Sequence, residues 1–170
     1  MALTALSNLD SQDIGSEIGR VVAAVNGQSI QQNEMIITET DGAGTYTATL
    51  SIPSGASVLD IIVNGLALWT NAGACTLIVG DGVDPDGFYT AVNLKATDLL
   101  AGESLSFALA GGKAGAYIAN SQVSPRYSAA ARDIIAEVIA ASTGGGAGRT
   151  RITVLWSLPD NANKTLAVKV

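Results

Sequence analysis

The sequence YTATLSI at residues 46–52 decides the fold class of this chain. Hydroxyl-bearing Thr47, Thr49 and Ser51 alternate there with an apolar set made of Tyr46, Ala48, Leu50 and Ile52. Successive side chains of a strand point to opposite faces, so this period of two places every apolar side chain on one face. The stretch predicts an antiparallel strand with one buried side and one solvent-facing side.

Short apolar or alternating runs continue on both sides of this strand, separated by glycine, asparagine, aspartate and proline. This punctuation is typical of a domain built from strands and tight turns. Further strands are expected at residues 17–25, 35–40, 57–69, 75–79, 88–92, 104–109, 117–119, 151–158 and 166–170. Within 57–69, Gly65 is compatible with one bent strand or with two strands. Residues 94–101 are compatible with a turn of helix.

Residues 129–141 fit two patterns. The spacing of Ile134, Ile135, Val138 and Ile139 suits an amphipathic helix, whereas Ile134, Ala136 and Val138 alternate as in a strand. A glycine-rich stretch at 144–148 follows, and residues 151–158 then alternate again. Two paired strands joined by a glycine loop explain this arrangement better than a single helix, so the sequence predicts a hairpin here.

About nine or ten such strands at regular spacing predict an all-β fold. An antiparallel β-sandwich or barrel satisfies this pattern, and a jelly roll is the leading candidate. Residues 1–16 are polar-mixed and weakly patterned, and are expected to form an extended N-terminal arm. The remaining residues, 17–170, are expected to form one sandwich domain.

The chain contains no histidine, and Cys75 is its only cysteine. Imidazole and thiolate groups carry most acid–base chemistry near neutral pH and most transition-metal ligation. A Ser-His-Asp triad is therefore impossible, and glycosidase-type carboxylate pairs are not favoured because the acidic residues lie mostly in turns. We expect no enzymatic activity, no catalytic residue, no metal and no cofactor. Cys75, in the apolar run 74–79, is expected to be a small buried side chain.

Charged residues make up 14% of the chain and hydrophobic residues 48%, with a net charge of −6. This balance provides no basic footprint for nucleic acid. No apolar run reaches the roughly 18 residues that cross a bilayer, and the first residues lack the basic start of a secretory signal. We therefore expect synthesis in the cytoplasm and no membrane partner. So little charge also predicts that other chains cover part of the apolar surface, as in a homo-oligomer.

Three carboxylates, Asp81, Asp84 and Asp86, fall within the loop GDGVDPDG at residues 80–87. Oxygen-rich loops can hold Ca²⁺, but neither Asp81 nor Asp84 starts the ligand spacing of an EF-hand. Tight turns explain the composition better, because glycine and proline set the backbone while aspartate accepts from local amides. A weak cation site of another kind is the alternative.

The C-terminal half concentrates its basic charge in four arginines: Arg126, Arg132, Arg149 and Arg151. A solvated edge face is the simpler interpretation, and ion pairs with an acidic partner surface are the alternative. Trp69 and Trp156 occupy apolar strand faces. Both are expected in the core, although either can anchor an interface.

Three stretches carry a resemblance to a known group of proteins. They read GTYTATLSIPSGASVLD at 44–60, LIVGDGVDPDGF at 77–88 and GRTRITVLW at 148–156. Together they resemble small structural proteins of tailed bacteriophages, several of which are similar to capsid decoration, or cement, proteins. The resemblance spans residues 44–158 and leaves the first forty residues outside.

This resemblance implies a β-sandwich subunit on the outside of a virion. The implied partner is the major capsid protein, the implied assembly is a homotrimer, and the implied location is the capsid surface. The group carries no catalytic residues, so none transfer to this chain. A structural role in the tail, neck or fibre base is the alternative, and a carbohydrate-binding module is a more distant one.

Overall fold

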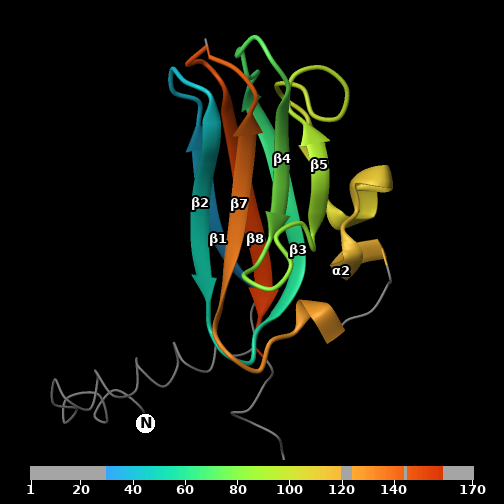
Figure 1. Ribbon diagram of the computed structural model, residues 1–170. Helices are drawn as coiled ribbons and strands as arrows, with labels where there is room; N and C mark the ends of the chain where they lie inside the picture. The colour runs from blue at the N-terminus through green and yellow to red at the C-terminus, as the bar shows by residue number, and fades with distance from the viewer. Residues whose placement is uncertain (1–29, 120–123, 144, 159–170) are drawn as a thin grey trace, which may run out of the picture.

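The structure is a computed structural model that describes residues 30–119, 124–143 and 145–158 (Figure 1). Its strands are β1 (Gln31–Thr38), β2 (Gly44–Ile52), β3 (Ser57–Ala67), β4 (Cys75–Gly80), β5 (Tyr89–Asn93), β6 (Ser104–Leu105), β7 (Arg132–Ala140) and β8 (Arg149–Ser157). Between β6 and β7 lie the short helices η2 (Phe107–Leu109), η3 (Gly111–Lys113), α2 (Ala116–Ala119) and η4 (Ser124–Arg126).

The eight strands of the described ranges form two four-stranded antiparallel sheets. The strand orders are β1-β8-β3-β6 and β2-β7-β4-β5, and the sheets pack face to face around one hydrophobic core. Both sheets contribute fully buried side chains, among them Ile61, Val63, Leu77, Val79, Ile134, Val138, Ile152 and Val154. The predicted all-β antiparallel sandwich is confirmed, and the strand order is consistent with an eight-stranded jelly roll.

The strand at residues 46–52 forms as its alternation predicts. Strand β2 pairs with β7 over nine residues without a break in register. Its hydroxyl side chains Thr47, Thr49 and Ser51 are exposed, while Ile52 is buried. Strand β7 is also confirmed over the helical alternative, because its alternate side chains Ile134, Ala136 and Val138 line the core.

Strand β3 is one bent strand rather than two. Its pairing with β8 shifts register between Gly65 and Ala67, which marks a bulge. A Cβ at Gly65 would lie 2.3 Å from the carbonyl oxygen of Leu100, so only glycine allows the two backbones to approach so closely.

The predicted hairpin between the last two strands is wrong. Strand β7 lies between β2 and β4 in one sheet, and β8 lies between β1 and β3 in the other. The eight residues 141–148 carry the chain from one sheet to the other instead of reversing it within a sheet. Eight residues are enough to cross the roughly 10 Å between packed sheets.

Three local expectations between β5 and β7 are also corrected. Residues 94–101 form turns rather than helix, because the Asn93 side chain accepts from the backbone amides of Lys95 and Ala96. The strand expected at 104–109 stops after two residues. Its second half is helix η2, whose first amide, that of Phe107, donates to Asp60.

The strand expected at 117–119 is instead the last part of helix α2. The backbone amide of Tyr117 donates to the carbonyl of Gly87, and the amide of Ala119 donates to that of Gly115. The Tyr117 ring packs edge-on against Phe88, with ring centroids 5.1 Å apart. These contacts fix a helical turn against the loop that enters β5.

Other expectations fall where no position is described. The arm at 1–16 and the strands at 17–25 and 166–170 lie outside the described residues. Across the part of the chain that is described, no helix has the length and apolar character needed to cross a membrane.

Candidate functional site

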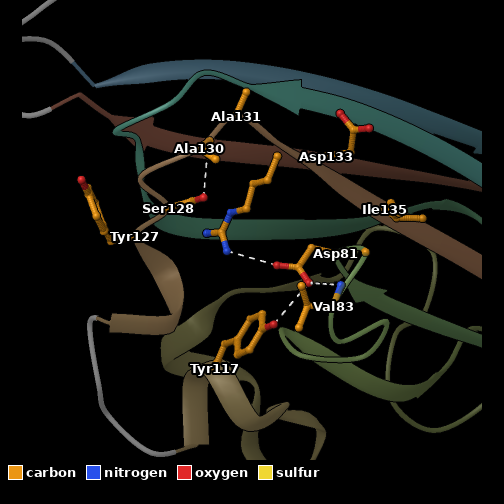
Figure 2. A pocket seen from close by; sticks show the side chains of 11 residues that line it. Asp81, Val83, Tyr117, Tyr127, Ser128, Ala130, Ala131, Asp133 and Ile135 are labelled. Carbon is orange, nitrogen blue, oxygen red and sulfur yellow. Dashed lines mark hydrogen bonds and ion pairs between the residues drawn. The ribbon is translucent and has the colours of Figure 1, made fainter.

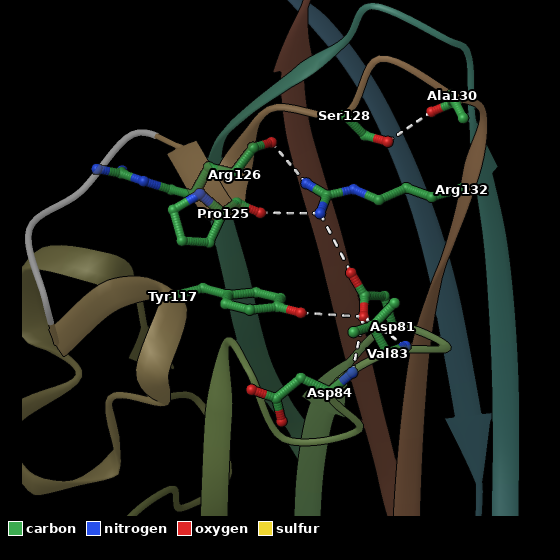
Figure 3. Close-up of polar contacts among 9 residues, drawn as sticks. All are labelled: Asp81, Val83, Asp84, Tyr117, Pro125, Arg126, Ser128, Ala130 and Arg132. Carbon is green, nitrogen blue, oxygen red and sulfur yellow. Dashed lines mark hydrogen bonds and ion pairs between the residues drawn. The ribbon is translucent and has the colours of Figure 1, made fainter.

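A polar cluster closes the end of the sandwich where β4 stops and β7 begins (Figure 3). Gly80 ends β4, and a Cβ there would lie 2.0 Å from the carbonyl oxygen of Asp84, so glycine is required for the chain to turn back. The Asp81 carboxylate accepts hydrogen bonds from the amides of Val83 and Asp84 at 2.9 and 3.0 Å. The loop is therefore the set of tight turns that its composition predicts.

Arg132 enters this cluster from the first position of β7. It continues the inward-facing series of Ile134 and Ala136, so its side chain points toward the end of the core. Nη1 of Arg132 lies 3.2 Å from Oδ2 of Asp81, and the Tyr117 hydroxyl donates to Oδ1 of Asp81 at 3.2 Å. The paired side chains of Arg132 and Asp81 are only 13% and 7% exposed.

The same guanidinium also binds the chain ahead of β7. Nη1 of Arg132 donates to the carbonyl of Pro125 at 2.9 Å, and Nη2 donates to that of Arg126 at 2.5 Å. The Arg132 guanidinium carbon lies 5.6 Å from the centroid of the Phe88 ring. One side chain thus links helix η4, the loop after β4 and the core. The expectation that Arg132 lies on a solvated edge face is wrong, because its side chain points inward and is largely buried. A charge in that position requires a buried counter-charge, which Asp81 supplies.

Burial raises the pKa of Tyr117 to about 12, and the nearby charge of Asp81 acts in the same direction. Its hydroxyl therefore stays protonated and remains a donor to Asp81 at neutral pH. Burial and the neighbouring carboxylate of Asp86 likewise raise the pKa of Asp84.

A hollow of about 500 Å³ opens beside this ion pair (Figure 2). Its wall combines small and apolar side chains with a few polar ones: Asp81, Gly82, Val83, Tyr117, Tyr127, Ser128, Ala130, Ala131, Arg132, Asp133 and Ile135. Val83 is 89% exposed, and Asp133 accepts a hydrogen bond from Ser51 at the rim. The hollow therefore offers a concave, mostly apolar surface with one solvent-accessible carboxylate, that of Asp133.

The three aspartates of the loop do not gather into a cation site. Both oxygens of Asp81 already accept from protein donors, one from backbone amides and Tyr117 and the other from Arg132. Across residues 30–119, 124–143 and 145–158, no group of three or more acidic or cysteine side chains is placed to hold a metal ion.

A second inward-facing charge closes the opposite end of the sandwich. Glu39 comes directly after β1, continues the inward-facing series of Met35 and Ile37, and is only 2% exposed. Its carboxylate accepts from the amide and hydroxyl of Thr70, each at 3.0 Å, and from the amides of Asn71 and Gly148, each at 2.8 Å.

Burial alone would raise the pKa of Glu39, but the hydrogen bonds from Thr70, Gly148 and Asn71 outweigh it and lower the pKa to about 2. Glu39 therefore remains ionised at neutral pH. Glu39 is not among the residues predicted from the sequence. The signal that could have found it is its alternation with Met35 and Ile37, which places a charge on a buried face.

Cys75 and the two tryptophans, all three expected to be buried, differ in their exposure in the structure. Cys75 is 1% exposed, as expected, and burial raises its pKa to about 11. Trp69 is buried and donates to the Thr150 hydroxyl at 2.9 Å, whereas Trp156 is half-buried and donates to Asn33 at 2.9 Å. Only the first is a true core side chain.

The four arginines do not share one face. Arg149 is exposed on β8, and Arg151 on the same strand lies 3.9 Å from Glu34 of β1. The Arg126 guanidinium carbon lies 5.6 Å from the centroid of the Phe107 ring, while the backbone carbonyl of Arg126 accepts from Arg132. Among these four, only Arg132 pairs its side chain with Asp81.

Comparison with known proteins finds solved structures of similar fold but assigns the chain to no family. No protein-family model matches the chain, and no curated protein matches it. Several solved structures do match the chain. A chain of the structure described as the cyanophage Pam1 capsid asymmetric unit has 20% identity and a TM-score of 0.52, covering 77% of this chain and 84% of that one. A chain of the capsid of Ralstonia phage GP4 has 19% identity and a TM-score of 0.52, covering 80% and 88%.

A third match is to the acid-stable capsid of Helicobacter pylori bacteriophage KHP30, at 15% identity and a TM-score of 0.48, covering 77% of this chain and 94% of that chain. At identities this low the likeness to the Pam1 and GP4 chains is one of fold. It extends over most of the sandwich.

Proposed function

We propose that this chain is a structural protein of a bacteriophage virion, and that it is a decoration, or cement, subunit on the shell of the major capsid protein. The observation that carries the proposal is the shared sandwich: chains of the Pam1 and GP4 capsid structures match 77% and 80% of this chain. The three sequence stretches at 44–60, 77–88 and 148–156 point independently to the same kind of protein.

The surface supports a role in assembly. Large apolar side chains at least 38% exposed include Ile36, Leu59, Leu66, Leu68, Val83, Leu100, Leu109 and Ile139. Together with the low charge of the chain, they leave apolar surface that contact with other subunits would bury. A subunit that binds only the assembled shell stabilises that shell by mass action, without any chemical step.

The proposal has several finer parts. The subunit forms a homotrimer at the capsid surface after synthesis in the host cytoplasm, and residues 1–16 extend over neighbouring chains as an arm. It has no catalytic role and requires no cofactor. Nucleic acid and membranes are not among its partners.

Mass spectrometry of purified particles, together with a cryo-electron map, tests the proposal. We expect the chain in the particles, and density for the sandwich on the outer surface of the head. Density in the neck, the tail or a fibre base would instead support the second structural role. Absence from the particles would contradict both, and binding on a glycan array would then favour a carbohydrate-binding module.

Deleting residues 1–16 tests the arm. We expect the truncated chain to attach more weakly to heads that lack the native protein, while its circular dichroism and melting temperature stay close to those of the full chain. Unchanged attachment would remove the arm from the proposal.

A further inference from the structure

The four outer edges of the two sheets are not equally protected. Sheet edges expose unpaired backbone groups, and proteins protect them with short strands, charged residues, bulges or covering segments. Strand β6 is only two residues long. Strand β1 carries Glu34, which lies near Arg151 of the neighbouring strand.

Strand β5 is protected more thoroughly. The backbone of its first residue, Tyr89, bridges to Ala114, and Nζ of Lys113 donates to the carbonyl of Ala91 at 3.1 Å. Ala91 also has a φ of 45°, and the pairing of β5 with β4 shifts register. Figure 1 shows the segment with η3 and α2 running along this side of the sandwich.

Within the described ranges, strand β2 has none of these protections. Its nine residues, GTYTATLSI, include no charge and no proline, and the register with β7 has no bulge. It is the last strand of its sheet, and no described residue forms a β-bridge with its outer edge. A long, regular, uncharged edge is a template for one more strand.

The core is open along the same edge. Tyr46, Ala48 and Leu50 face inward from β2 but are only half-buried. On β7, the next strand of the sheet, the inward side chains Ile134 and Val138 are completely buried. A strand added outside β2 would cover these three half-buried side chains.

We infer that the outer edge of β2 accepts residues 17–25 of a second copy of this chain as an added antiparallel strand. This inference rests on the proposed homo-oligomer and names the surface that forms it. The segment reads EIGRVVAAV, is predicted from its sequence to be a strand, and has nine residues, as β2 does.

The direction of the strands favours a second copy over the same one. Strands β1 and β2 run in opposite directions, so β1 begins at the end of the sandwich where β2 finishes (Figure 1). A segment just before β1 would run parallel to β2 of its own chain. A neighbouring copy can supply it antiparallel, which is the more frequent arrangement. Residues 26–30 reach about 16 Å when extended, enough to pass to a chain packed at that edge.

Disulfide trapping tests this contact with two full-length variants. Aligning the centres of the two antiparallel segments pairs residue 22 with residue 47, so one chain carries Val22→Cys and an isotopically labelled chain carries Thr47→Cys. The chains are mixed, refolded together and oxidised, and the cross-link is found by mass spectrometry. Each chain has one added thiol, and native Cys75 is buried, so a labelled–unlabelled disulfide between 22 and 47 can form only between copies.

Thr76→Cys is the matched control. Thr76 lies on the outer face of the same sheet, but β4 is flanked by β7 and β5 and offers no edge. We expect a 22–47 cross-link in the larger part of the mixed oligomer and at least ten times less 22–76 cross-link.

Three results would overturn the inference. One is a single-copy native mass for the unmodified chain. Another is an oligomeric mass without any cross-link from position 47 to cysteines at 20, 22 or 24. The third uses a chain that carries both Val22→Cys and Thr47→Cys: a 22–47 cross-link found only within one chain would assign the strand to its own copy. All these measurements use isolated protein, so they are independent of whether the chain is found on phage heads.

Discussion

The two ends of the sandwich each bury one charged side chain that the strand pattern directs inward, but they neutralise it in different ways. At one end, Glu39 receives hydrogen bonds from backbone amides of two loops, and Thr70 adds a hydroxyl. At the other end, Arg132 meets the carboxylate of Asp81 beside an open hollow. At the first end, hydrogen bonds connect the segment after β1 to the loops at Thr70 and Gly148. At the second end, the hollow beside the ion pair leaves space that water or another molecule can enter.

The largest expected effect is at the closed end. Glu39→Gln keeps the shape of the side chain but replaces one acceptor oxygen with a donor that faces backbone amides. We expect the free energy of unfolding to fall by about 3 kcal/mol, because buried amides lose a charged acceptor. Urea denaturation of both proteins at pH 7 measures this difference. A loss below about 1 kcal/mol would mean that the carboxylate does not hold the loops.

Acid should remove the same contribution from the native protein. The folded pKa of Glu39, about 2, lies below its ordinary value of 4.5. The stabilisation is therefore complete above about pH 4.5 and is lost as the pH falls toward 2. This amounts to roughly 3 kcal/mol by linkage. Unfolding curves between pH 6 and pH 2 should show this loss in the native chain and a flatter profile in Glu39→Gln. Parallel profiles would contradict the assignment.

A smaller effect is expected at the open end. Arg132→Met should cost about 2 kcal/mol, less than the change at Glu39, because water in the hollow can reach the groups that lose their partner. A double-mutant cycle with Asp81→Asn should give a coupling of roughly 1–2 kcal/mol. Additive effects would mean that Arg132 acts through its carbonyl contacts at Pro125 and Arg126 instead.

The smallest effect is expected on the exposed face of β1. Glu34→Gln removes the partner of Arg151, but the two side chains are 51% and 40% exposed and 3.9 Å apart. We expect a change within about 0.5 kcal/mol. This variant is also the matched control for Glu39→Gln, since both remove one carboxylate charge from the same region of the sequence. Equal losses would show that net charge, not the buried contacts, determines the result.

Alternation was enough to predict which faces are buried. The pattern of residues 46–52 and of β7 follows directly from where a strand points its side chains. The same rule, applied to charged residues as well, would also have found Glu39 and Arg132. Each occupies the next alternate position beyond an apolar series, and an inward charge at that position requires a partner.

Pairing could not be predicted in this way. Alternation indicates which face of a strand is buried but not which strand lies beside it. The pattern therefore predicts a hairpin of β7 and β8, although the two strands belong to different sheets. The helical turns at Phe107 and Tyr117 were missed for a related reason. Their conformation depends on contacts with Asp60, Gly87 and Phe88, which are distant in sequence. No local pattern carries that information.

The division of β7 and β8 between the sheets has a consequence for synthesis on the ribosome. Each is an interior strand of its sheet, and both emerge after the other six. Among the described strands, β1 pairs only with β8 and β2 only with β7, so a nascent chain that ends before Arg132 lacks both of these pairings. The sheet that contains β7 is complete only after Ala140 has been translated, and the sheet that contains β8 only after Ser157. The apolar faces of the earlier strands therefore stay exposed until late in synthesis, which is the state of a nascent chain that chaperones protect.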